Sequence, residues 1–242
     1  MLEAADRIQR IHQVGFTYRY LYGVQELKRR VLQGDIGEPY YIRLRHESWD
    51  GMHPDFKVSY REKLSLVGGG VLHNVGSHLF DLSHHLIGRS ESVTGFTMFL
   101  PRERRDKLSK QFTPVETDDI AAAWYRCGTG VRGEWFASRA SPSSLGGRAY
   151  VEVVGTEGAL RASLSRGPKE SLTISRPDAP EWVDLCLPAQ ALDGEPHCLA
   201  LMMRSFVDAC LRGSLNETTD ASFHDGMMAQ KAISAIEAAS CD

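Results

Sequence analysis

The chain has 242 residues, 42% of them hydrophobic and 24% charged, with a net charge of −3. This is the composition of an ordinary globular protein with room for one large domain or two small ones. The charge gives no reason to expect nucleic acid or an anionic membrane as a partner, and no apolar run approaches the roughly 20 residues of a membrane span. The charged start of the chain is not expected to act as a secretory signal. Five widely spaced cysteines without a C-x-x-C pair favour reduced thiols in a cytoplasm.

The elements expected before residue 68 mix helix and strand. In chain order they are the end of a helix over residues 2–10, a short buried strand over 11–17, an amphipathic helix over 20–33, a strand with one wet face over 38–48 and a polar loop over 51–67. The helix over 20–33 is expected to end at Gly34 and to turn five apolar residues inward: Leu21, Val24, Leu27, Val31 and Leu32.

The most informative stretch is a glycine turn, Gly68–Gly70, that runs into a helix expected to reach Leu86 and to stop at Gly88. At about 100° per residue, one arc of this helix, roughly 60° wide, is polar and carries Asn74, His78, Asp81 and His85. An adjacent arc is apolar and suits the core: Val71, Val75, Leu79, Leu82 and Leu86. Because no Lys, Arg or Glu lies between Gly70 and Gly88, the polar arc predicts a wet cleft rather than open solvent.

Two other interpretations of the polar arc stay open. A histidine beside an apolar stripe is often a hydrogen-bonded structural residue, and Asp81 and His85 are expected to be structural. The spacing of His78, Asp81 and His85 also resembles a metal site. No second cluster of Cys, His or Glu completes a ligand shell, so we predict no metal.

Beyond residue 90 the sequence predicts a run of strands and then two helices. The strands are expected at 91–100, 117–127, 131–139, 149–155, 159–163, 170–176 and 181–186. The short links Gly128–Gly130 and Gly155–Gly158 are of the hairpin kind, so neighbouring strands should be antiparallel. The helices are expected at about 196–212, ended by Gly213, and at 222–239, with Asp220 and Ser222 as N-cap candidates.

This order predicts an α+β fold, a large and mostly antiparallel sheet covered on one face by helices. If the other face of so broad a sheet is apolar, it is expected to meet a partner. Candidates for inner or partner-facing positions are Val151, Val153, Leu160, Leu172 and Ile174. The basic segment Pro101–Gln111 is expected to be a solvated loop, with a phosphate or partner contact as the alternative.

Six segments resemble motifs of the Gfo/Idh/MocA oxidoreductases in the order that this family has them. The segments are Val14–Tyr20 (vGf-x-x-R-f), Leu27–Pro39 (lk…G-x-iGep), Gly68–Asp81 (GGG-x-l-x-D-x-G-x-H-x-x-D), Thr117–Asp119 (vDD), Val154–Gly158 (i-x-G-t-e-G) and Phe223–Gly226 with the following helix (f-x-d-G). Each segment alone is a weak signal, but the ordered set covers nearly the whole chain and is specific.

The resemblance implies that half of a family member is absent. Members begin with a Rossmann domain that carries G-x-G-x-x-G, followed by a Glu-Lys-Pro motif with a catalytic lysine; we expect neither in this chain. Residues 1–18 resemble the last helix and strand of that domain. Residues 19–242 resemble the C-terminal domain, which is implied to bind substrate and to form homo-oligomers through its sheet.

The resemblance also implies roles for individual residues. His78 matches the family's motif histidine, implied to share proton transfer with the missing lysine, and a neutral imidazole suits that task. Asn74 takes the second catalytic position, where many members have Asp; it can hydrogen-bond a hydroxyl but cannot take a proton. Further matching positions are implied to contact substrate, and Arg19 also the cofactor: Tyr18, Arg19, Arg45, His46, Trp135, Ser138 and Arg139.

Two functional hypotheses follow from the resemblance. The first is oxidation or reduction of a sugar, polyol or related alcohol with NAD or NADP, for which this chain supplies the substrate-binding half. The alternative is a non-catalytic substrate-binding or oligomerisation module that cannot bind a dinucleotide by itself. A third hypothesis, nucleic-acid binding, has the basic residues of 102–110 in its favour and conflicts with the net charge.

Overall fold

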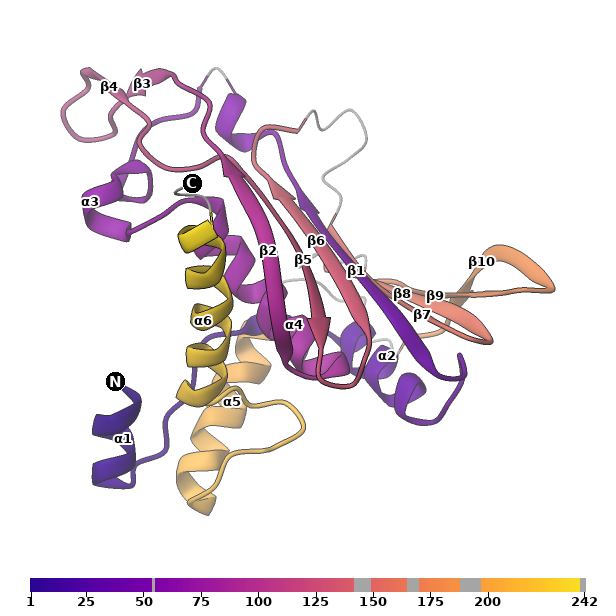
Figure 1. The fold of residues 1–242 in the computed structure, drawn as a ribbon. Coiled ribbons are helices and arrows are strands. Elements are labelled where there is room, and N and C mark those ends of the chain that lie inside the picture. Colours follow the sequence, from indigo (N-terminus) through magenta and orange to yellow (C-terminus); the bar gives the residue numbers. More distant parts are fainter. Residues whose placement is uncertain (54, 142–148, 165–169, 188–196, 240–242) are drawn as a thin grey trace.

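The computed structural model describes residues 1–53, 55–141, 149–164, 170–187 and 197–239 (Figure 1). The helices are α1 (Leu2–Ile8), α2 (Tyr22–Leu32), α3 (Leu64–Val67), α4 (Ser77–Ile87), α5 (His197–Arg212) and α6 (Phe223–Ala239), with short helical turns η1 (Thr17–Tyr20), η2 (Asp50–Met52), η3 (Tyr60–Glu62) and η4 (Leu72–Gly76). The strands are β1 (Pro39–Glu47), β2 (Ser90–Met98), β3 (Glu103–Arg105), β4 (Phe112–Pro114), β5 (Ile120–Cys127), β6 (Arg132–Ser138), β7 (Ala149–Gly155), β8 (Gly158–Ser163), β9 (Leu172–Arg176) and β10 (Ala179–Leu185).

The described strands form one 8-stranded sheet and a separate β3–β4 pair. The strand order of the large sheet is β10-β9-β8-β7-β1-β6-β5-β2. Strands β1 and β6 are parallel, and every other neighbouring pair is antiparallel. Helices α2, α4 and α6 lie along one face of this sheet, and none of the described helices lies over the opposite face (Figure 1). The predicted α+β fold is therefore confirmed.

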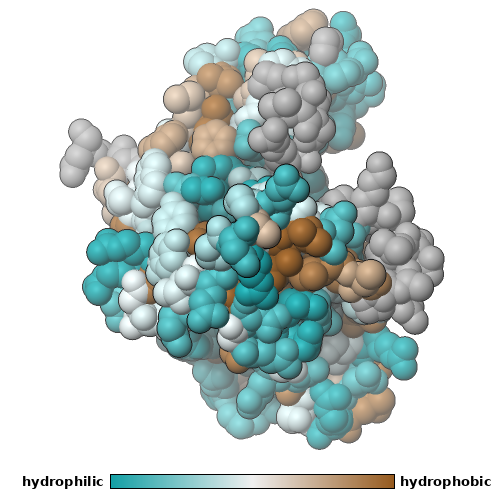
Figure 2. Space-filling model, turned by 90° about the vertical axis from the view of Figure 1, so that its right-hand side faces the viewer, coloured by the Kyte–Doolittle hydropathy of each residue, from teal (hydrophilic) through white to brown (hydrophobic). Residues whose placement is uncertain are grey.

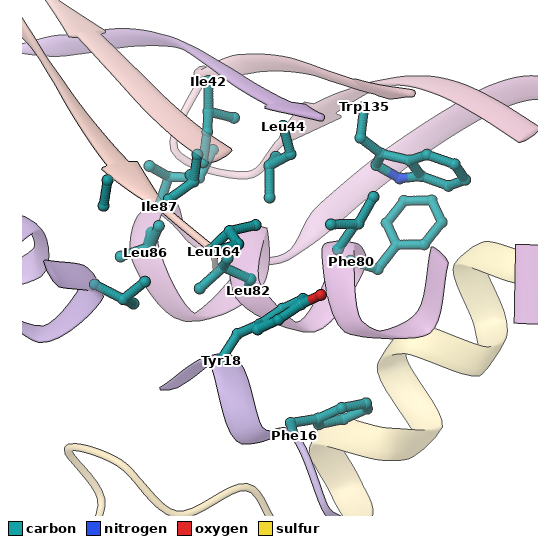
Figure 3. Packing of buried hydrophobic residues seen from close by; sticks show 14 of the residues in the cluster. Phe16, Tyr18, Ile42, Leu44, Phe80, Leu82, Leu86, Ile87, Trp135 and Leu164 are labelled. Atoms are coloured by element: carbon teal, nitrogen blue, oxygen red, sulfur yellow. The ribbon is translucent and has the colours of Figure 1, made fainter. Parts of the chain in front are cut away.

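The core lies between the sheet and the helices, because strand residues alternate between the two faces. All five strand residues that were candidates for inner or partner-facing positions are buried on the helix side: Val151, Val153, Leu160, Leu172 and Ile174. Phe80 of α4 packs edge-to-face on Trp135 of β6, with ring centroids 5.3 Å apart (Figure 3).

The open face of the sheet is charged and aromatic in its middle rather than apolar. Arg43 on β1 pairs with Glu134 on β6 at 2.9 Å, and Arg161 on β8 pairs with Glu152 on β7 at 2.5 Å. Viewed from the right-hand side of Figure 1, hydrophobic areas are interspersed among hydrophilic ones (Figure 2). Large aromatic side chains on this face stay exposed, among them Trp124, which is 47% exposed.

Two expectations about individual segments are wrong, and two others hold in part. Residues 11–17 form no strand; Val14 N–H donates to the carbonyl of Ala221, which is not in a strand. Leu32 is 75% exposed because α2 ends there and turns it outward. The basic segment Pro101–Gln111 is mostly exposed, as expected, but it contains the short strand β3, which pairs with β4. The helix expected after Gly70 is present and ends at Gly88 as predicted, but it opens with the π-helical turn η4 before α4 begins.

One G-x-G-x-x-G spacing does occur in the sequence, at Gly128, Gly130 and Gly133. It forms the tight turn between the antiparallel strands β5 and β6. A dinucleotide-binding glycine turn instead joins a strand to a helix N-terminus, whose amides face the pyrophosphate. The expectation that the G-x-G-x-x-G pattern is absent from the sequence is thus wrong. The pattern that is present lies in a β-hairpin.

Candidate functional site

The glycine turn is anchored by Asp118 of the Thr117-Asp118-Asp119 segment. Its two carboxylate oxygens accept from Gly70 N–H at 2.6 Å and from Leu72 N–H at 2.8 Å, and its carbonyl accepts from Val71 N–H at 3.2 Å. These are amides at the start of a helix that would otherwise lack partners. A carboxylate at this position also interacts favourably with the helix dipole. Asp118 therefore fixes the place from which the motif helix starts.

Asn74 lies within the π-helical turn η4, where it is exposed. Single π turns inside helices are rare and often occur at functional sites, because the extra residue rotates side chains away from their α-helical positions. His73, next to Asn74, contacts Glu237 of α6 through its Nε2 at 2.6 Å and so ties the turn to the last helix. The turn thus presents Asn74 beside α6 and the end of the sheet.

A cavity of about 510 Å³ opens beside this turn. Its lining includes Asn74, His46 near the end of β1, and Ser138 and Arg139 at the end of β6; Phe56 and Tyr60 from the segment between β1 and α3 line it as well. The volume falls within the roughly 300–1,000 Å³ that is usual for small-molecule sites. Four of the residues implied by the family resemblance, Asn74, His46, Ser138 and Arg139, are brought together here.

Arg139 is held rigidly at this cavity. Its Nε donates to Asp119 at 2.8 Å, its Nη1 to Glu62 at 3.1 Å and its Nη2 to the hydroxyl of Thr117 at 3.1 Å. Its guanidinium also lies over the ring of Phe56, 5.6 Å from the centroid. The positive charge is therefore balanced by two carboxylates within the protein.

His78 lies one turn beyond Asn74 and does not line this cavity. Its ring packs against Phe16, with centroids 5.4 Å apart, and against Tyr18, with centroids 5.3 Å apart. Both aromatic residues are buried, at 5% and 6% exposure. In Figure 3, Tyr18 extends from η1 toward α4. Tyr18 and His78 are thus neighbours, at a second location on the same helix.

Arg19 is buried and makes its contacts inside the protein. Its Nε and Nη2 donate to the two oxygens of Asp81 at 2.9 and 2.5 Å, and its Nη1 donates to the carbonyl of Asp220 at 3.2 Å. Burial raises the pKa of Asp81 to about 6, although the hydrogen bonds from Arg19 act in the opposite direction. Asp81 therefore has the structural role expected from the sequence, with an arginine as its partner.

Arg45 and Trp135 lie away from the cavity. Arg45 alternates with Leu44 and His46 on β1, so it lies on the open face, where it donates to Glu134 at 2.9 Å. Trp135 is 1% exposed within the core, where its ring sits close to Gly76. Neither side chain reaches the cavity lining in this arrangement.

The other polar positions of the motif helix are occupied by protein partners. Both ring nitrogens of His85 lie 3.3–3.4 Å from Lys28 Nζ, and burial lowers the pKa of His85 to about 3. Burial likewise lowers the pKa of His84, to about 4. Within the described ranges, no group of three His, Cys, Asp or Glu is placed to hold a metal ion.

Two features of the site were missed from the sequence. The first is the capping role of Asp118. The paired acidic residues before a strand indicate such a role, but the amides that Asp118 caps lie 46 and 48 residues away in the sequence. The segment 51–67 was expected to be a polar loop, yet Ser59-x-x-Glu62 is a capping-box pattern, and the box is formed at η3. Ser222 and Asp225 cap α6 in the same way, while Asp220 accepts from Tyr20 and Ser205.

Residues 24–161 match the family model described as the GFO/IDH/MocA C-terminal domain. The match covers more than half of the chain. The chain belongs to this family. The resemblance in the sequence motifs is thereby confirmed, and the fold agrees with it.

Two of the similar proteins are dehydrogenases. Levoglucosan dehydrogenase of Pseudarthrobacter phenanthrenivorans is 26% identical over 69% of this chain and 45% of its own length. The scyllo-inositol 2-dehydrogenase (NAD(+)) of Bacillus subtilis is 27% identical over 87% of this chain and 55% of its own length. The chain thus spans about half of the length of these relatives.

Solved structures share the fold along the whole chain. A levoglucosan dehydrogenase in complex with NADH and L-sorbose superposes with a TM-score of 0.87 and 21% identity, over 100% of this chain and 67% of that one. An NAD-binding oxidoreductase from Klebsiella pneumoniae gives a TM-score of 0.81 and 24% identity, over 98% and 66%. In the part of this chain that the structure describes, no helix is long and apolar enough to cross a membrane.

Proposed function

We propose that this chain is the substrate-binding and proton-handling half of an NAD- or NADP-dependent oxidoreductase that acts on a sugar, polyol or related alcohol. The observation that carries the proposal is the cavity at the motif turn, where Asn74, His46 and Ser138 present hydrogen-bonding groups. Such groups match the alternating donors and acceptors of hydroxyl-rich ligands. The activities for which the relatives are named, on levoglucosan and scyllo-inositol, support the same ligand class.

The substrate proposed for this cavity is neutral. Arg139 lines it with its charge already paired with Asp119 and Glu62. A carboxylate ligand would have to compete with these two partners. A hydroxyl can instead accept from Asn74 or donate to it without a change of charge.

Hydride transfer would be the chemistry of the nicotinamide, and the family's lysine would share the proton with His78. The residues of this chain can orient a hydroxyl-bearing ligand at Asn74. They can also hold the imidazole of His78, which packs against Tyr18 one helical turn from Asn74. Asn74 cannot act as a base, so His78 is the proton-handling side chain on this helix.

The test is ligand binding by saturation-transfer NMR with levoglucosan, scyllo-inositol and L-sorbose as probes. We expect weak, saturable binding of at least one probe, loss of binding in Asn74→Leu and retention in Gln33→Leu, a matched amide substitution on the exposed end of α2. Absence of binding for all three probes, or equal binding in Asn74→Leu, would contradict the proposal.

We further propose that the chain does not bind a dinucleotide by itself and that it self-associates through the open face of its sheet. The hairpin position of Gly128–Gly133 and the absence of Glu-Lys-Pro from the sequence support the first part. The exposed Trp124, whose ring lies 6.3 Å from that of Phe96, supports the second.

Calorimetry with NAD and NADP should give no saturable heat, and tight binding of either would contradict the first part. Sedimentation should give an oligomer that Trp124→Glu dissociates, whereas Leu32→Glu, at an exposed site on α2, leaves it intact. A wild-type monomer at high concentration would contradict the second part.

A further inference from the structure

The Arg19–Asp81 pair joins the two segments on which His78 and its aromatic neighbour stand. Arg19 directly follows Tyr18 in η1, and Asp81 comes three residues after His78 on α4. The side chains of Arg19 and Asp81 are 5% and 2% exposed. The pair is bidentate, with N–O distances of 2.9 and 2.5 Å, so it fixes direction as well as distance.

The segment that carries Tyr18 has little regular structure of its own to hold it. It is a four-residue turn preceded by residues 10–16, which form neither helix nor strand. Arg19 supplies cross-links from this turn to two helices: its fork binds Asp81 on α4, and its Nη1 donates to the carbonyl of Asp220 just before α6. The carboxylate of Asp225 on α6 is a further neighbour of Arg19, with its Oδ1 3.6 Å from Nη2.

We infer that Arg19 and Asp81 are positioning residues for His78. The pair sets the separation of η1 and α4, and this separation decides how the imidazole of His78 meets the ring of Tyr18 at 5.3 Å. Only the catalytic meaning of that position rests on the proposed function, in which His78 handles the proton. The proposal gives Arg19 a role inside the protein, in place of the substrate or cofactor contact implied by the resemblance.

Lysine cannot reproduce this arrangement, because an ammonium is a point charge without the planar fork. Arg19→Lys keeps the charge that compensates buried Asp81 and removes the directional contact. Asp81→Asn keeps the size of the side chain and one acceptor oxygen and removes the charge. Both substitutions should therefore let η1 shift relative to α4 while leaving the hydrophobic core in place.

The experiment is NMR of the whole chain, with the His78 ring signals assigned by their loss in His78→Gln. In folded Arg19→Lys and Asp81→Asn, we expect displaced His78 ring-nitrogen shifts and loss of the ring-to-ring NOE between Tyr18 and His78. Arg30→Lys, which alters an ion pair with Glu26 on the outside of α2, should leave both readouts unchanged. Leu160→Ala, a buried substitution on β8, should lower the unfolding midpoint without changing either readout.

Unchanged shifts and an unchanged NOE in either folded variant would overturn the proposal. If both variants fail to fold while Arg30→Lys and Leu160→Ala fold, the pair is a requirement of folding only, and the proposal is equally overturned. None of these readouts uses a sugar or a dinucleotide. A failure of the proposed function would therefore appear in the ligand experiments and not here.

Discussion

Alanine substitutions at the three consecutive glycines of the turn should have very different effects, because each added Cβ meets a different obstacle. At Gly70 it would lie 2.2 Å from the carbonyl oxygen and 2.7 Å from the nitrogen of Asp118. Backbone atoms cannot rotate away, so the turn must separate from Asp118. The separation breaks the two hydrogen bonds that the backbone N–H groups of Gly70 and Leu72 donate to the Asp118 carboxylate, at 2.6 and 2.8 Å. At about 1.5–3 kcal/mol for each bond to a charged group, Gly70→Ala should cost about 3–6 kcal/mol.

The other two glycines supply matched comparisons. Gly68 has a φ of +75° and open space around the added Cβ, so Gly68→Ala should cost about 1 kcal/mol from the left-handed conformation. At Gly69 the Cβ would lie 2.2 Å from Cδ2 of His73, a side chain that can swing aside. That movement gives up the partly exposed His73–Glu237 contact, so Gly69→Ala should cost about 1 kcal/mol or less.

The assay is urea unfolding of the wild type and the three variants, followed by tryptophan fluorescence and circular dichroism. The expected order of destabilisation places Gly70→Ala well above the other two. If Gly70→Ala costs no more than Gly68→Ala, the reasoning from the Asp118 anchor is refuted. Folded Gly70→Ala should also lose the ligand binding assigned to Asn74, whose turn starts at this anchor.

Two further predictions concern stability. Asp119 is buried and bonded to Arg102 and Arg139; burial alone would raise the pKa of Asp119, but these hydrogen bonds hold it below its ordinary 3.8. The stability that the Asp119 carboxylate contributes is present above pH 3.8 and is lost as the pH falls through the lowered pKa. In urea unfolding, Asp119→Asn should therefore be roughly 3–5 kcal/mol less stable than the wild type at pH 7, and this deficit should shrink below about pH 4. A deficit that does not change with pH would contradict this. Phe80→Ala should cost about 3–5 kcal/mol and red-shift the emission of Trp135, and an unchanged spectrum would argue against their contact.

Local sequence signals were sufficient for most of the secondary structure. The β1 strand was expected at 38–48 and runs Pro39–Glu47, and the last helix was expected at 222–239 and runs Phe223–Ala239. Hairpin glycines and capping residues act over a few positions, so they can be read from the chain. The same reasoning predicted a strand over residues 11–17, and that prediction was wrong because an apolar run becomes a strand only where another strand lies beside it.

The candidate site was predicted less completely than the fold. Arg45 and His46 were both expected to contact substrate, yet adjacent strand residues point to opposite faces, and His46 lines the cavity. Trp135 matched a family position by sequence but fills the core against Phe80. Which matched residue faces a cavity depends on which face of the sheet the helices cover, and the alternation of residues alone does not decide that.

The sequence by itself determined the order of strands and helices, the glycine turn with its polar arc, and the family, because these depend on neighbours in the chain and on motif order. The tertiary structure decided the partners. Gly70 meets Asp118 across 48 residues, and Arg19 meets Asp81 across 62. Such contacts arise when the sheet and helices pack, and they alone divide the polar arc into Asn74 at the cavity, His78 against Tyr18, and Asp81 in the interior.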